Sequence, residues 1–221
     1  MRLTAFRYGT TEITERMAFQ DGREDEKIPV SLMFFLIEEG KRKILVDVGC
    51  DTMPGFELFE FEKPVNVLEK CGVMSEEITD VVITHSHHDH IAALYNYPKA
   101  AVYINEKELP QAEKYLPDKS KAVLFRKSKK LLSNVGILCV GGHSEGSSVV
   151  LIERKGSIYV LCGDECYTSE NLAERKPTGS SCSLDKCKAF VEEYSKEKYT
   201  PILFHDPCVV EKIGFRVIFE D

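Results

Sequence analysis

Four of the six histidines in this 221-residue chain fall within residues 85–90, which read His-Ser-His-His-Asp-His. The apolar segment 80–84 directly precedes them and is expected to form a strand. A strand end followed by a loop lets side chains converge on one point, and imidazole and carboxylate groups suit zinc, iron or manganese. The run therefore predicts a metal site built from His85, His87, Asp89 and His90.

The spacing within this run indicates two cations. His85 and His87 can turn towards one metal, while Asp89 and His90 face a second. Four ligands do not complete two sites, so further donors are needed from elsewhere in the chain.

Three later residues meet this need, since each closely follows an expected strand. His143 lies in a glycine-rich turn, and His205 follows the segment 201–204. Asp164 ends the apolar segment 158–162 and is the natural carboxylate to bridge two cations. We expect these side chains to complete a binuclear centre.

Composition limits the other possibilities. With 43% hydrophobic residues the chain can bury one sizeable core, and we expect a single domain over residues 1–221. The net charge of -7 is spread along the chain, which argues against nucleic-acid binding. No apolar run approaches the ~20 residues of a membrane span, and the first 17 residues lack a signal-peptide pattern, so a cytoplasmic protein with eight reduced cysteines is expected.

Hydrophobic periodicity predicts a mixture of strands and helices. Strands are expected at 2–8, 30–38, 43–48, 81–84, 101–104, 137–140, 148–153, 157–162, 201–204 and 215–219. Helices are expected at 65–71, 106–115 and 184–198, the last with Ser183 as N-cap. Two runs of strands, each followed by helices, favour an α/β fold with two mixed sheets face to face and helices outside, a four-layer αββα sandwich.

Residues 85–90 match the H-x-H-x-D-H signature of the metallo-β-lactamase superfamily, which this chain resembles over most of its length. Residues 44–49 are similar to the L-x-D-x-G segment of that family, and the later histidines and Asp164 follow in the family order. The resemblance implies the metallo-β-lactamase fold with a dimetal centre at one edge. Asp47 matches a position that does not bind metal, and it either holds the ligand loop by hydrogen bonds or caps a turn.

The resemblance also distributes the ligands between the metals. It implies one metal held by His85, His87 and His143, a second held by Asp89, His90 and His205, and Asp164 as the bridge. His88 falls at a variable position and is expected at the edge of the pocket or on the surface.

Such a centre predicts a hydrolase. Two divalent metals, zinc with iron or manganese as alternatives, lower the pKa of a shared water from about 15.7 to about 7 and provide a bridging hydroxide. That nucleophile can attack the carbonyl of an ester, lactone, thioester or amide in a small acyl substrate.

Tyr167 narrows the expected substrate. The arrangement of Asp164 and Tyr167, D-x-x-Y, resembles the N-acyl homoserine lactonases, which implies that the tyrosine hydroxyl binds the lactone carbonyl and that Asp89 passes a proton to the leaving alkoxide. A half-buried packing role is the alternative for Tyr167. The loop at His143 departs from the G-H-x-x-G-H pattern of that group, because Ser147 stands where the second histidine is usual.

Several alternatives stay open or are disfavoured. An acyl groove is suggested by residues 17–19 and 33–36, although core packing explains the second segment equally well. A thioester hydrolase resembling glyoxalase II shares all seven ligands but carries a further C-terminal segment, whereas this chain ends soon after His205. Other small-ester hydrolases remain possible. Zinc β-lactamases lack the bridging acid, diiron relatives carry Glu where His87 stands, and a non-catalytic sensor would show eroded ligands.

Overall fold

In the computed structural model, which describes residues 1–118 and 121–221, twelve strands form two mixed sheets. The larger sheet has the order β12 (Gly214–Glu220), β1 (Arg2–Thr14), β2 (Lys27–Glu39), β3 (Arg42–Val46), β4 (Asp80–Val82), β5 (Ala101–Asn105) and β6 (Ala122–Phe125). The smaller has the order β11 (Tyr199–Ile202), β10 (Ser157–Leu161), β9 (Ser148–Arg154), β8 (Val135–Cys139) and β7 (Ser128–Lys130). Strands β3 to β6 run parallel, as do β10 and β11, and the other pairs are antiparallel.

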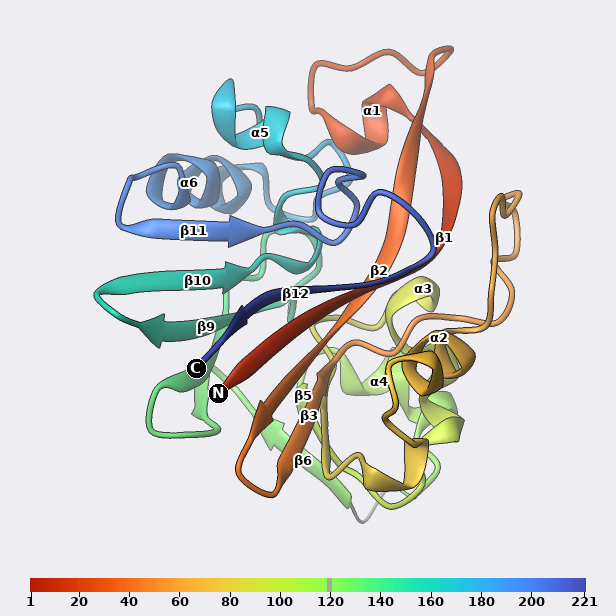
Figure 1. Ribbon diagram of the computed structural model, residues 1–221. Helices are drawn as coiled ribbons and strands as arrows, with labels where there is room; N and C mark the ends of the chain where they lie inside the picture. Colours follow the sequence, from red (N-terminus) through yellow and green to blue (C-terminus); the bar gives the residue numbers. More distant parts are fainter. Residues whose placement is uncertain (119–120) are drawn as a thin grey trace.

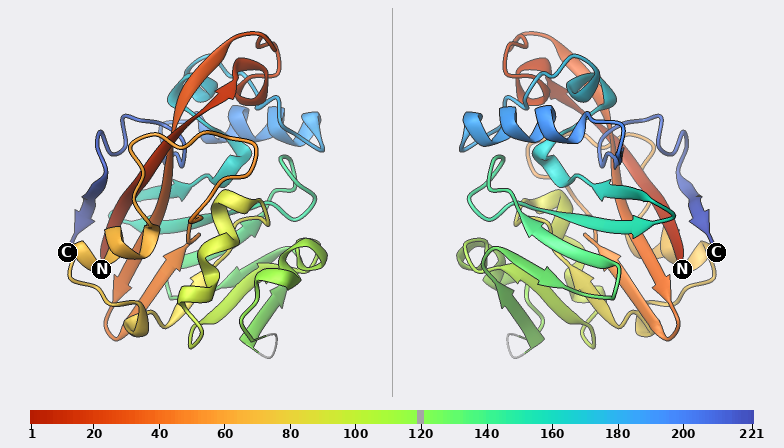
Figure 2. Two further views of the ribbon diagram at one scale, coloured as in Figure 1. Left: turned by 90° about the vertical axis from the view of Figure 1, so that its right-hand side faces the viewer. Right: turned by 90° about the vertical axis from the view of Figure 1, so that its left-hand side faces the viewer.

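Helices cover the outer faces of both sheets (Figure 1; Figure 2). On the larger sheet lie α2 (Pro64–Lys70), α3 (His88–Ile91) and α4 (Leu109–Ala112), and on the smaller lie α5 (Ser169–Ala173) and α6 (Leu184–Tyr194). A short α1 (Glu15–Ala18) follows β1, and the 3₁₀ turns within residues 1–118 and 121–221 include η1 (Ser75–Glu77), η2 (Ala92–Asn96), η3 (Glu113–Tyr115) and η5 (Gly163–Glu165). This arrangement confirms the predicted αββα sandwich.

The alternation of side chains along β2 explains why the layers hold together. Phe35 and Ile37 pack between the two sheets, in the cluster that includes Ile152 of β9. Phe34 and Leu36 point the other way, into the cluster beneath α2 and η2. All of these side chains are fully buried, as expected for a strand covered on both faces. The segment 33–36 therefore belongs to the core, and its alternative interpretation as an acyl groove was wrong.

Some predicted elements differ from the observed ones. Strands β6 and β7 were missed: β6, at the edge of its sheet, is a run of only four apolar residues, and β7 reads Ser-Lys-Lys. The helix expected at 106–115 contains α4 and η3 but begins with a turn at 106–108. The last predicted helix ends at Tyr194, before 198, and Ser183 is at its N-cap position without a side-chain capping bond. Among the described residues, no helix is long and apolar enough to cross a membrane.

One edge of the sandwich collects the ends of several strands. The segments that follow β3, β4, β8, β10 and β11 contain Asp47, residues 85–90, His143, Asp164 and His205, respectively. Strand β8 lies antiparallel to β9, and β9 antiparallel to β10, so β8 and β10 end at the same edge. The topology thus brings together residues separated by more than a hundred positions in the chain.

Candidate metal centre

The first group of donors consists of three imidazole nitrogens and one carboxylate oxygen. Nδ1 of His87 lies 3.1 Å from Nε2 of His85 and 2.8 Å from Nε2 of His143. Oδ2 of Asp164 lies 3.7 Å from Nε2 of His85 and 3.5 Å from Nε2 of His143. All four donor atoms lie within 4.8 Å of one another, so one cation can contact them together.

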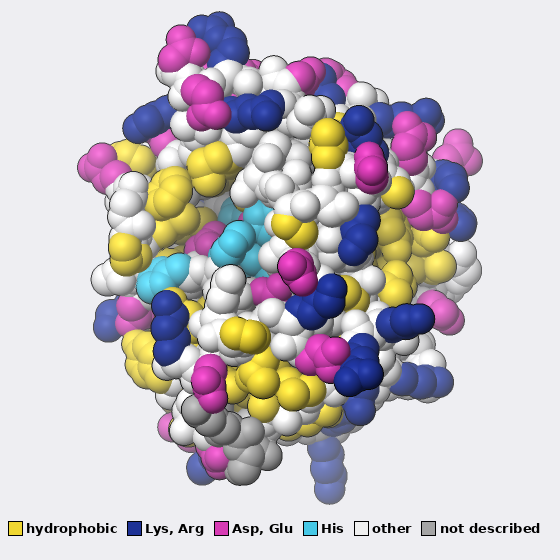
Figure 3. Space-filling model, turned by 180° about the vertical axis from the view of Figure 1, so that it is seen from behind, with side chains coloured by type: hydrophobic (Ala, Val, Ile, Leu, Met, Phe, Trp, Pro, Cys, Tyr) yellow, Lys and Arg dark blue, Asp and Glu magenta, His cyan; other side chains and the backbone are white. Residues whose placement is uncertain are grey.

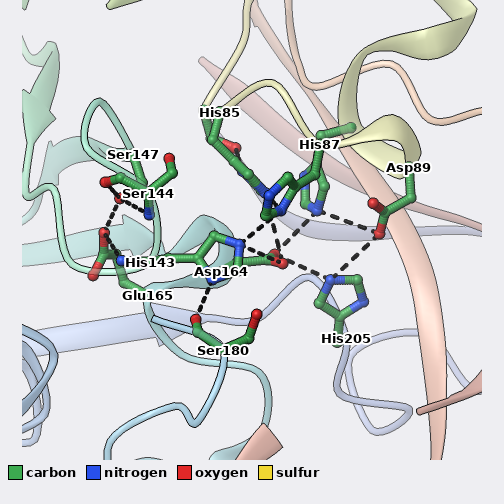
Figure 4. A network of polar contacts seen from close by, with 12 residues as sticks. His85, His87, Asp89, His143, Ser144, Ser147, Asp164, Glu165, Ser180 and His205 are labelled. Carbon is green, nitrogen blue, oxygen red and sulfur yellow. Dashed lines mark hydrogen bonds and ion pairs between the residues drawn. The ribbon is translucent and has the colours of Figure 1, made fainter. Parts of the chain in front are cut away.

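The second group meets the other oxygen of the same carboxylate. Oδ1 of Asp164 lies 3.0 Å from Nε2 of His90 and 3.1 Å from Nε2 of His205. Oδ2 of Asp89 lies 3.5 Å from Nε2 of His90 and 3.8 Å from Nε2 of His205. Asp164 therefore directs one oxygen at each group, in the position expected of a bridging ligand (Figure 4).

These separations fit a metal centre. Ligands about 2.0–2.2 Å from a tetrahedral metal ion lie roughly 3.3–3.6 Å apart, close to the spacings in both groups. Nε2 of His90 is buried and has no hydrogen-bond partner, although several acceptors surround it. An orphaned, inward-facing imidazole nitrogen is costly unless a ligand occupies the space before it.

In four of the histidines, the ring nitrogen Nδ1, which faces away from the donor groups, makes a polar contact with the surrounding protein. Nδ1 of His90 donates to Asp47 at 2.6 Å, and Nδ1 of His85 lies 3.1 Å from the hydroxyl of Thr84. The main-chain carbonyl of Ser180 accepts from Nδ1 of His143 at 2.6 Å, and that of Ser31 accepts from Nδ1 of His205 at 2.8 Å. Such rear contacts select the tautomer that leaves Nε2 free for a metal.

Electrostatics at the centre favour neutral imidazoles at His85 and His87. Burial, aided by the neighbouring histidines, lowers the pKa of His85 well below its ordinary value and also lowers the pKa of His87. Burial alone would raise the pKa of Asp164, but His90, His205 and His85 together hold it well below the usual range. The neutral imidazoles of His85 and His87, together with the carboxylate of Asp164, form a donor set that divalent zinc, iron or manganese accepts.

A cavity of about 210 Å³ opens onto both groups. Histidines lie at the bottom of a hollow in the surface, with hydrophobic side chains along one side (Figure 3). Its apolar wall is formed by Ile13, Met17, Val30, Leu32, Met53, Pro54 and Phe56. Met17 thus lines the cavity as predicted, whereas Ala18 and Phe19 are buried behind it in a cluster with Tyr167.

Tyr167 forms part of the same cavity. Its ring stacks on His205, with the centroids 4.9 Å apart and the planes 22° from parallel. Burial, together with the carboxylates of Asp164 and Asp89, raises the pKa of Tyr167 well above its ordinary value. The hydroxyl therefore stays protonated at neutral pH and can donate a hydrogen bond.

A comparison of the sequence with known protein families agrees with the arrangement of the metal-binding side chains. The sequence profile described as Metallo-beta-lactamase superfamily matches residues 33–204. The chain belongs to the metallo-β-lactamase superfamily. This membership confirms the resemblance seen in residues 85–90.

Individual members of the superfamily are similar along most of the chain. An N-acyl homoserine lactonase of Bacillus cereus is 26% identical over 216 residues, 84% of each chain. A solved N-acyl homoserine lactone hydrolase, with the product N-hexanoyl-L-homoserine bound at its catalytic metal centre, gives a TM-score of 0.78 at 18% identity over 93% of each chain. The dizinc quorum-quenching lactonase AidC, solved with a product, gives 0.75 at 18% identity over 99% of this chain and 94% of AidC. The two structures confirm the metallo-β-lactamase fold.

Some residues at this superfamily site had no recognisable sequence signal. Ser31 and Ser180 contribute only carbonyl oxygens, which any residue could supply. Glu108 and Glu165 are buried carboxylates beside the ligand loops, and neither stands out by motif or spacing. His88 lies at the cavity edge, as predicted, and is hydrogen-bonded to Tyr115 and to the carbonyl of Thr52.

Proposed function

We propose that this protein is a dimetal hydrolase that opens lactones carrying an apolar acyl substituent, such as N-acyl homoserine lactones. The observation that carries the proposal is the shared carboxylate of Asp164, which faces two donor groups at the floor of a largely apolar cavity. When bound, two divalent metals would supply hydroxide at neutral pH and polarise the substrate carbonyl. The lactonase relatives support this choice of substrate.

In this proposal the ligands divide into two sets. His85, His87 and His143 hold the first metal, Asp89, His90 and His205 hold the second, and Asp164 bridges them. Zinc is the proposed metal, because imidazole and carboxylate donors suit it and a dizinc lactonase has the same fold.

Residues of the chain would also act on the substrate directly. Tyr167 donates a hydrogen bond to the carbonyl oxygen, where negative charge develops during attack. Asp89, at the cavity wall, accepts the proton of the attacking hydroxide oxygen and passes it to the departing alkoxide as the ring opens. The apolar wall of the cavity, which includes Ile13, Met17 and Phe56, excludes water from the acyl group and orients the ester.

The proposal also includes the domain organisation and the cellular location of the protein. Residues 1–221 would form one hydrolase domain, since β12 near the C-terminus pairs with β1 near the N-terminus. A cytoplasmic location is supported by eight cysteines, all of which are free.

The substrate proposal can be tested with the purified, zinc-loaded protein and a pH-indicator assay. The panel contains N-hexanoyl homoserine lactone, an unsubstituted lactone, a thioester and a β-lactam. We expect acid release from the lactones, faster with the acyl substituent. Release from the thioester alone would overturn the lactone proposal in favour of a thioester hydrolase.

A further inference from the structure

Two buried carboxylates hold the loop that carries His143, one from each side. Glu108 precedes α4, whereas Glu165 directly follows Asp164. Their residues are 4% and 0% exposed, and no ion pair joins either to a cation among residues 1–118 and 121–221. Burying a carboxylate without a cationic partner is costly, so the hydrogen bonds that each accepts must stabilise it.

Glu108 joins two ligand loops. Its Oε2 accepts hydrogen bonds from the backbone nitrogen and the hydroxyl of Ser86, at 2.8 and 2.6 Å. Its Oε1 accepts from the hydroxyl of Ser144 at 2.6 Å and from the backbone nitrogen of Gly146 at 2.9 Å. Ser86 separates His85 from His87, so one carboxylate fixes the segments of all three histidines in the first group.

Glu165 holds the same loop from the opposite side. Its Oε1 accepts from the backbone nitrogens of Gly142 and His143, at 3.0 and 3.3 Å, and from the hydroxyl of Ser147 (Figure 4). Because Glu165 adjoins Asp164, these bonds tie the loop to the bridging carboxylate.

The loop is shaped to fit both carboxylates. A Cβ atom on Gly146 would lie 2.8 Å from Cγ of Glu108, and one on Gly142 would overlap the carboxylate of Glu165. Ser147 stands where the related lactonases are expected to carry a second histidine, and its hydroxyl bonds to Glu165 instead. The small residues of this loop therefore leave room for the two glutamate side chains and supply hydrogen bonds to them.

We propose that Glu108 and Glu165 are positioning residues that set the geometry of the first metal site, the one formed by His85, His87 and His143, without touching the metal. The second group depends on other supports, namely Asp47 for His90 and the carbonyl of Ser31 for His205. Loss of either glutamate thus weakens one metal site selectively. The inference rests on the dimetal centre proposed above but not on the lactone substrate.

The test measures zinc affinity by competition with a chelator in the variants Glu108→Gln and Glu165→Gln. Each substitution keeps the size of the side chain but replaces one accepting carboxylate oxygen with an amide nitrogen, which can only donate. We expect one of the two sites to weaken about tenfold or more, and the other to change by less than about threefold, as for other groups that orient metal ligands. Glu145→Gln is the matched control, because this exposed residue lies in the same loop with its carboxylate directed away from the centre.

Combining the glutamate substitution with a ligand substitution identifies which metal site is weakened. His143→Ala removes a ligand of the first site, so adding Glu165→Gln should leave the remaining zinc affinity unchanged, a non-additive result expected of residues acting through one ligand. Equal weakening in both backgrounds, or wild-type binding at both sites in the glutamine variants, would overturn the inference. Should a glutamine variant fail to fold, Ser144→Ala and Ser147→Ala each delete one bond to a glutamate and must weaken the same site. A protein that binds two zinc ions with this pattern but leaves lactones intact would refute the lactone proposal alone.

Discussion

The carboxylate of Asp47 lies 2.6 Å from Nδ1 of His90 and also accepts hydrogen bonds from the backbone nitrogen and hydroxyl of Thr84, at 2.8 and 2.7 Å. Asp47 adopts a φ of 58°, a left-handed conformation that costs a non-glycine residue of order 1 kcal/mol or more. Its three contacts offset that cost. The end of β3 therefore positions a ligand of the second group, which is the supporting role considered for Asp47 from the sequence.

Replacement of Asp47 tests this role. In Asp47→Ala, Nδ1 of His90 loses its acceptor, and we expect zinc affinity at the second site to fall about 10–100-fold. Chelator competition on the purified variant measures the change. Asp25→Asn, which alters an exposed carboxylate far from any ligand in sequence, serves as control. Unchanged affinity in Asp47→Ala would show that the contact has no influence on the metal.

Tyr167→Phe separates catalysis from metal binding. The variant keeps the ring that stacks on His205 but loses the hydroxyl, so both zinc ions should be retained while kcat falls about a hundredfold, as when one oxyanion donor is removed. Steady-state kinetics with metal analysis provide the measurement. Tyr159→Phe, on β10 against Phe219, should behave like the wild type. A normal kcat in Tyr167→Phe would reduce Tyr167 to a packing residue.

Met17 tests the acyl-binding wall. Met17→Trp should fill part of the cavity and reduce kcat/KM for N-hexanoyl homoserine lactone about tenfold, since two displaced methylenes are worth about 1.6 kcal/mol. The unsubstituted lactone should be hydrolysed nearly as well as before. Met74→Trp is the matched control at an exposed methionine. An equal loss with both lactones would place the acyl group elsewhere.

Glu108 gives a pH-dependent prediction for stability. Burial opposes its ionisation, but hydrogen bonds from Ser144, Ser86 and Gly146 outweigh that effect and lower its pKa from the ordinary 4.5. A lowered folded-state pKa stabilises the protein above the unfolded value, and this contribution is lost as the pH falls through the folded value. In the metal-free state, Glu108→Gln should cost about 1–3 kcal/mol near pH 6, and progressively less below about pH 4.5. Urea unfolding of both proteins across this range measures the difference, and a gap independent of pH would contradict the assignment.

Much of the fold was predictable because its signals are local. Strand β4 is a short apolar run immediately before the histidines, and the last helix shows a clear apolar face. Strand β7 was not predictable in this way, since it reads Ser-Lys-Lys, whereas β6 is a run of four apolar residues, Ala-Val-Leu-Phe, too short to tell a strand from a helix by periodicity. Pairing with β8 stabilises β7 and pairing with β5 stabilises β6, and sequence periodicity does not report such pairing.

The residues of the candidate site also differ in whether the sequence alone predicts them. Its seven proposed ligands are recognisable because imidazole and carboxylate groups follow strand ends in a characteristic order. The groups that orient them, such as Glu108 and the carbonyl of Ser180, come from distant segments and become neighbours only when both sheets close. Glu108 was expected within a helix, yet it lies in the turn before α4, where its side chain reaches two loops.

Hydrolysis by this protein is expected to depend on two metals held around Asp164. The most direct measurement is lactone hydrolysis by metal-free protein titrated with zinc, followed by the same titration of Asp164→Asn. We expect no hydrolysis without zinc, a rate that saturates at two zinc ions per chain, and little recovery in Asp164→Asn. Undiminished hydrolysis by the metal-free protein would contradict this expectation.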